Sequence, residues 1–218
     1  MSMEDKYQKF LKFLFDREES QEDWRFDYEL EEPRLTESEV ILFVRRMLEN
    51  YESDIAQYSD WQLGKGVDYI FNNSCSDISF VIRDGKIPVE EKVSVILALK
   101  VFFKKCLNER CVPSLGHLSE EGNELNHFCY MVWDTTPLTY CEQSSSKDEI
   151  YRAVAEVMEY SLTLSNVACI ESGLHGLGHL HGYFENASKI VRNYIKKSSV
   201  TDSRLIKYAK NAEIGYVQ

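Results

Sequence analysis

The chain has 218 residues, of which 44% are hydrophobic and 12% aromatic, and it carries a formal net charge of −11 with only 4 prolines. A chain of this length and composition can bury a substantial core, which excludes a wholly disordered protein. The acidic balance argues against nucleic acid as a direct partner, because phosphate binding requires a basic face.

The sequence contains no segment typical of a membrane protein. The densest apolar run, residues 93–103, is interrupted by Ser94 and Lys100, and it is shorter than the roughly 20 residues of a bilayer span. Residues 1–15 carry charges throughout, unlike a secretory signal. The 6 cysteines form no C-x-x-C pair, which favours reduced, buried thiols over disulfides or a reactive or metal-binding cysteine. We therefore expect a cytoplasmic protein.

Helical periodicity begins at the N-terminus. Residues 4–15 carry apolar side chains at helical spacing, which predicts an amphipathic helix. Thr36 and Glu39 form a capping-box pattern and predict a second helix that ends near Tyr51. Asp60 is expected to cap a third helix.

Two features of the next region leave alternatives open. Gly64 and Gly66 either weaken the third helix or permit a close helix crossing. Residues 78–82 are the stretch most similar to a strand, although no convincing alternating pattern occurs anywhere in the chain. Pro88 is expected in the first turn of a long helix, which runs to about residue 111 and is apolar around most of its circumference. Such a helix is typical of the centre of a fold.

Further helices are predicted in the second half of the chain. They cover residues 123–133, residues 147–164 with Ser146 and Glu149 as a second capping box, a helix after Asn166, residues 185–197, and a last helix capped by Thr201 or Asp202. We therefore predict a single all-α domain, 1–218, with about nine or ten helices. Short connections favour an irregular stack of antiparallel helical pairs, similar to HEAT or armadillo proteins, and residues 1–35 are expected to pack as an acidic cap.

The C-terminal quarter of the chain resembles a group of bacterial helical proteins. Residues 173–209 resemble uncharacterised bacterial helical proteins in which a glycine-rich helix similar to Leu-His-Gly-Leu-Gly-His-Leu precedes two more helices. The resemblance implies a bacterial helical stack, and it implies no activity.

Acidic residues are concentrated near the N-terminus. Residues 16–32 contain nine carboxylates and two arginines, with aromatic residues between them, whereas residues 185–218 contain 7 basic and 3 acidic residues. The acidic segment is either a solvated face or a docking surface for a cationic partner. The candidate partner-binding residues are Asp16, Glu18, Glu19, Glu22, Asp23, Trp24, Asp27 and Glu29.

One motif has residues that could carry chemistry. Glu171, His175 and His179 recur at i, i+4 and i+8, and His181 follows. Two histidines one turn apart can bind zinc, but the general-base Glu of an H-E-x-x-H motif is absent. The interleaved glycines favour close helix packing with hydrogen-bonded histidines. We therefore expect no metal and no cofactor, and Glu171, His175, His179 and His181 are the alternative metal ligands.

These patterns favour a binding protein over an enzyme. The chain has neither a phosphate-binding loop nor a nucleophile elbow. We predict a non-catalytic protein that neutralises a basic protein, such as a toxin domain, in the manner of an immunity protein. The alternatives are a helical scaffold that binds a peptide or protein on a concave face, and a metal-dependent enzyme based on His175, His179 and His181. The oligomeric state is not predicted.

Overall fold

The computed structural model describes residues 2–20, 23–27, 29–197 and 202–217, and within these ranges it contains helices and no strand. The prediction of an all-α fold is therefore confirmed. The helices are α1 (Met3–Phe15), α2 (Glu37–Glu49), α3 (Tyr51–Asp54), α4 (Asp60–Phe71), α5 (Ile78–Asp84), α6 (Val89–Phe102), α7 (Asn108–Arg110), α8 (Glu124–Thr135), α9 (Lys147–Ser161), α10 (Val167–His179), α11 (Ala187–Lys197) and α12 (Ser203–Glu213). Short 3-10 turns form at Trp24–Phe26, Gly116–Leu118 and Pro137–Thr139, and a π-helical segment at Phe103–Leu107.

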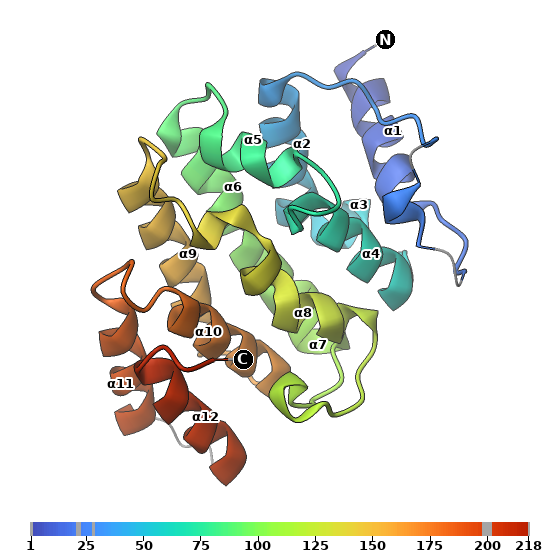
Figure 1. Ribbon diagram of the computed structural model, residues 1–218. Helices are drawn as coiled ribbons and strands as arrows, with labels where there is room; N and C mark the ends of the chain where they lie inside the picture. Colours follow the sequence, from blue (N-terminus) through green and yellow to red (C-terminus); the bar gives the residue numbers. More distant parts are fainter. Residues whose placement is uncertain (1, 21–22, 28, 198–201, 218) are drawn as a thin grey trace.

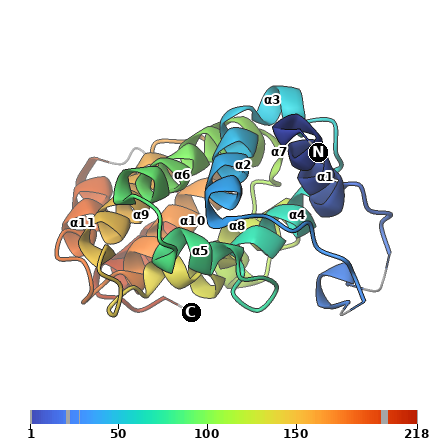
Figure 2. The ribbon, with the colours of Figure 1, turned by 90° about the horizontal axis from the view of Figure 1, so that it is seen from above.

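The chain progresses along the molecule from one end to the other. The N-terminal helices lie at one end and α11 and α12 lie at the opposite end (Figures 1 and 2). Helices α6, α8 and α10 occupy the middle, since α6 packs against α2 and α9, α8 against α4 and α10, and α10 against α9 and α12. None of the helices in the described ranges has the length and apolar character that a membrane span requires.

Polar side chains begin most of the helices as the sequence predicts. The Thr36 hydroxyl accepts a hydrogen bond from the Glu39 amide, and the Glu39 carboxylate accepts one from the Thr36 amide. Asn166 caps α10 and Asp202 caps α12, while the alternative cap Thr201 lies outside the described residues.

Two predictions of local structure are wrong, and the stretch most similar to a strand is helical, in agreement with the all-α prediction. The cap of α4 is Ser59 rather than Asp60, which is the first residue of the helix. Ser146 makes no capping hydrogen bond, because its backbone (φ −110°, ψ 21°) departs from the extended conformation of a capping residue. Residues 78–82 form part of α5 rather than a strand, and α5 packs against α2 and the Pro137–Thr139 turn instead of pairing with a strand.

The predicted central helix is confirmed. Pro88 stands immediately before Val89, the first residue of α6. The π-helical segment and α7 extend this helix to Arg110, and the side chains of Leu99, Phe102 and Phe103 are fully buried. Lys100 lies at the surface of α6 and pairs with Glu156 of α9.

The glycines of α4 permit a close helix crossing, as one of the two predictions proposed. A Cβ atom on Gly66 would lie 2.8 Å from the Leu14 carbonyl oxygen of α1, and one on Gly64 would lie 2.8 Å from backbone atoms of Glu124 at the start of α8. Contacts this short do not occur for real side chains, so both helices approach α4 only because these positions lack a side chain.

Five of the cysteines are buried and Cys75 is partly exposed. Burial raises the pKa of the Cys106 and Cys141 thiols to about 12 and that of Cys75 to about 11. These thiols behave as small core side chains, in agreement with their predicted burial.

Candidate functional site

The histidine face of α10 packs against α8. Glu171, His175 and His179 lie on α10 at one-turn intervals, as the sequence predicts. Close packing is possible because α10 has glycine where its neighbours approach. A Cβ atom on Gly176 would lie 2.8 Å from the Trp133 ring of α8, and one on Gly173 would lie 2.5 Å from the Met158 carbonyl oxygen of α9.

Two of these side chains converge on an aspartate from α8. The Asp134 carboxylate lies 2.6 Å from His175 Nε2 through one oxygen and 2.9 Å from His179 Nε2 through the other. The two Nε2 atoms are 3.0 Å apart. We call Asp134, His175 and His179 the histidine–aspartate cluster, and its three ligand-type atoms face a common point.

The cluster lies at the edge of the core. The His175 side chain is 1% exposed, whereas Asp134 and His179 are 28% and 31% exposed. Burial alone would raise the pKa of Asp134, but hydrogen bonds from both imidazoles, and their charge when protonated, hold that pKa well below its usual range. The carboxylate therefore remains ionised, and one side of the cluster is open to solvent.

Tyrosines from two helices surround His175. The Tyr208 hydroxyl of α12 lies 2.5 Å from His175 Nδ1, and the Tyr130 ring of α8 lies against the His175 ring with centroids 4.6 Å apart. Burial and the neighbouring Tyr130 raise the pKa of Tyr208, so its hydroxyl stays protonated. The orientation of the His175 ring is therefore set by contacts on both of its nitrogens.

The other two predicted metal candidates point elsewhere. The buried Glu171 carboxylate accepts hydrogen bonds from the backbone amides of Gly116 (2.7 Å) and His117 (3.1 Å), and it pairs with the His117 ring. His181 lies beyond the end of α10, where its Nδ1 is 2.9 Å from the Ser188 hydroxyl. Glu171 thus fastens the loop before α8, and neither residue takes part in the cluster.

Sequence reasoning missed Asp134. It follows Trp133 near the end of α8, and the pattern of its neighbours indicates only a polar helix end. The available signal was the helical spacing of Tyr130 and Asp134 on α8, which places both on one face. That signal has meaning only once α8 is known to oppose α10.

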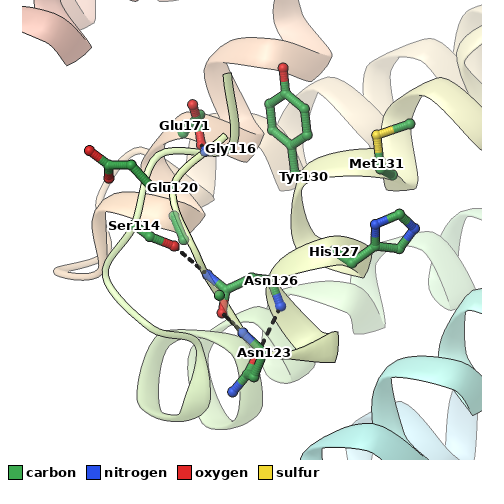
Figure 3. A pocket seen from close by; sticks show the side chains of 11 residues that line it. Ser114, Gly116, Glu120, Asn123, Asn126, His127, Tyr130, Met131 and Glu171 are labelled. Carbon is green, nitrogen blue, oxygen red and sulfur yellow. Dashed lines mark hydrogen bonds between the residues drawn. The ribbon is translucent and has the colours of Figure 1, made fainter. Parts of the chain in front are cut away.

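A cavity of about 240 Å³ lies beside α8. Figure 3 shows the carboxylates of Glu120 and Glu171 near one another, with Asn123 and Asn126 at the opposite end. These polar groups already hold loop structure: Asn126 donates to the Val112 carbonyl at 2.7 Å and to Ser114 at 3.2 Å, and Glu120 accepts from the Leu115 amide at 2.8 Å. Several polar groups of this cavity are therefore already used to brace the loop.

The acidic segment contains two kinds of residue. Its exposed carboxylates are Asp16, Glu18, Glu19, Asp27, Glu29, Glu31 and Glu32, and Glu22 lies outside the described residues. Asp23 is half-buried and pairs with Arg25 and Lys65. Trp24 is partly buried and stacks on Tyr69 with ring centroids 5.2 Å apart. The structure therefore places Asp23 and Trp24 among the contacts that hold the segment to α4.

A buried ion pair anchors this segment. Arg25 binds Asp68 of α4, and the two side chains are 8% and 3% exposed. Burial raises the pKa of Asp68, although the charge of Arg25 opposes this effect. The side chain of Arg17 covers the Trp24 ring at 4.7 Å from its centroid. Residues 23–25 are thus held against α4, and Trp24–Phe26 form a 3-10 turn.

Comparisons with known proteins provide no further identification. No protein-family model matches the chain, and neither a curated protein nor a solved structure matches it.

Proposed function

We propose that this protein is a non-catalytic binding protein that neutralises a basic protein partner, with a toxin-immunity protein as the concrete form. The proposal is based on the anchoring and the exposure of the acidic segment. The segment is anchored by Arg25 and Trp24, yet seven of its described carboxylates are exposed to solvent. Among the described residues 16–29, the carboxylate that pairs with cations is Asp23.

The arrangement suits electrostatic recognition. The exposed carboxylates outnumber the neighbouring cation Arg17, and a surplus of carboxylates creates a negative potential that speeds encounter with a basic surface. Because the segment is already held in place, a partner would not have to order it on binding, which reduces the entropic cost of association.

The N-terminal half of this surface has the most negative potential. Asp16, Glu18 and Glu19 line a hollow of about 550 Å³ together with Arg17, Ser59 and Gln62. The neighbouring hollow also contains Lys9 and Lys12, which weaken its negative potential. We therefore place the centre of the contact at Glu18 and Glu19, beside α4.

The test measures association with the product of the adjacent reading frame in the native host, which is the first candidate for the basic partner. The double variant Glu18→Gln/Glu19→Gln should associate at least several-fold more slowly at low salt and show a weaker dependence on ionic strength. Glu109→Gln/Glu149→Gln removes two exposed carboxylates elsewhere and serves as the matched control. Equal association rates for the two variants at low salt would refute the assignment of the surface.

A further inference from the structure

We propose that the histidine–aspartate cluster is a binding site for one divalent transition-metal ion of the Zn²⁺ class. The site would be formed by Asp134 from α8 and by His175 and His179 from α10. This inference is independent of the proposed function, because the cluster and the acidic segment share no residue.

The first argument is convergence. The two Nε2 atoms lie 3.0 Å apart, and each faces a different oxygen of the Asp134 carboxylate, at 2.6 Å and 2.9 Å. One ligand atom from each residue lies within 4.8 Å of the other two. A tetrahedral Zn²⁺ ion, with bonds of about 2.0–2.1 Å, needs ligand atoms about 3.3 Å apart. The three groups would therefore have to separate by less than about 1 Å to admit the ion.

The second argument is the contact between the two imidazoles. At 3.0 Å, one Nε2 can donate to the other only if the acceptor nitrogen carries no hydrogen, and that nitrogen then turns a lone pair toward an ionised Asp134 oxygen. If both Nε2 atoms carry hydrogens for Asp134, the two N–H groups crowd each other. A cation between the three atoms removes this conflict, because both lone pairs and the carboxylate can then direct electrons at one centre.

The third argument is the support around the ligands. Metal-bound histidines usually bond their second nitrogen to a neighbouring group, which fixes the tautomer and the ring orientation. Tyr208 stands in that position, 2.5 Å from His175 Nδ1. When His175 binds a metal through Nε2, its Nδ1–H donates to the Tyr208 oxygen. Helices α8, α10 and α12 each contribute one part of this arrangement.

The ligand types indicate the class of ion. Two imidazoles and one carboxylate suit zinc and related transition metals, whereas Mg²⁺ and Ca²⁺ prefer oxygen ligands alone. The exposed side formed by Asp134 and His179 leaves a position for water, as in zinc sites with three protein ligands. His175, which is 1% exposed, closes the opposite side.

The experiment uses the full chain, prepared without a histidine tag and freed of metal by chelation. Zn²⁺ is titrated by calorimetry, with Mg²⁺ as the comparison ion, and the melting temperature is measured with and without Zn²⁺. We expect one Zn²⁺ per chain, a higher melting temperature with Zn²⁺, and no effect of Mg²⁺. Visible absorption after addition of Co²⁺ reports whether nitrogen and oxygen ligands surround the ion.

The chain contains a matched control. His179→Ala removes a partly exposed ligand and should raise the Kd for Zn²⁺ at least 10-fold, whereas His181→Ala removes a histidine two residues away that bonds Ser188 instead and should leave the Kd unchanged. Tyr208→Phe keeps the ring but removes the contact to Nδ1, and such changes reduce metal affinity about 10- to 100-fold.

Three outcomes would overturn the proposal. They are an absence of saturable Zn²⁺ binding in the micromolar range, equal Zn²⁺ binding by wild type and His179→Ala, or loss of binding in His181→Ala. If Zn²⁺ does not bind, the Asp134 carboxylate is held by hydrogen bonds from His175 and His179 alone. Binding to the basic partner is measured on the same His179→Ala protein and should not change, so this failure and that of the proposed function are distinguishable.

Discussion

The acidic segment and helix α10 use polar residues in opposite ways. In the acidic segment, most carboxylates lie at the surface, and one buried ion pair with Asp68 holds the backbone in place. In α10, almost every residue is buried, and the polar side chains of Glu171, Ser172 and His175 each bond a specific group on another element. The number of charges is therefore a poor guide to structural importance, because burial and partners decide it.

The comparison predicts that single changes in the anchor or in α10 alter stability, whereas changes in the exposed carboxylates do not. The largest effect is expected for Arg25→Met. It leaves Asp68 buried without its partner, which should reduce the free energy of unfolding by about 3 kcal/mol, as measured by urea denaturation. The double variant Arg25→Met/Asp68→Leu removes both charges and should recover much of the loss. If Arg25→Met were as stable as wild type, the segment would not be anchored as described.

The glycines of α10 provide the second prediction. Gly173→Ala places a Cβ atom 2.5 Å from the Met158 carbonyl oxygen and should cost about 2 kcal/mol in unfolding free energy, even though alanine favours the helix. Gly178→Ala is the control. Its Cβ atom would meet the side chain of Val217, which can rotate away, so its stability should stay close to that of wild type. Equal stability of both variants would contradict the close approach of α9 to α10.

The third prediction concerns alkaline pH. Burial raises the pKa of Cys141 to about 12 in the folded protein, while an unfolded thiol titrates near about 8.5. The unfolded state therefore releases its proton first, and the stabilisation present below about pH 8.5 is lost as the pH rises toward 12. Within this window each such thiol contributes a slope of about 1.4 kcal/mol per pH unit.

Cys141→Ser tests this effect by urea denaturation across the alkaline range. The serine hydroxyl can still donate to the carbonyl oxygens of Pro137 and Leu138 that accept from the thiol, but it does not titrate. The decline of stability above pH 8.5 should be shallower in this variant. An unchanged slope would show that the thiol is not shielded from solvent.

The smallest effect is expected for the exposed carboxylates. Glu18→Gln/Glu19→Gln should change the free energy of unfolding by less than about 0.5 kcal/mol, since both side chains are exposed and form no ion pair among the described residues. A large loss of stability would indicate a structural role for these residues and would remove the basis for treating them as a binding surface.

Local sequence determined most of the helices of this protein. The amphipathic spacing of α1, the Thr36–Glu39 capping box and the Asn166 cap depend on residues two to four positions apart. These features therefore depend on interactions within a single segment. The same local geometry placed Glu171, His175 and His179 on one face of α10.

Tertiary structure decided how these helices and side chains are used. Whether residues 78–84 form a helix or a strand, and whether Trp24 faces a partner or Tyr69, depends on packing against distant parts of the chain. The partner of His175 and His179 is Asp134, more than 40 positions away, and it cannot be found from spacing because no local interaction links α8 to α10. A helical repeat fixes which residues share a face, but only the packing of the whole chain fixes which faces meet.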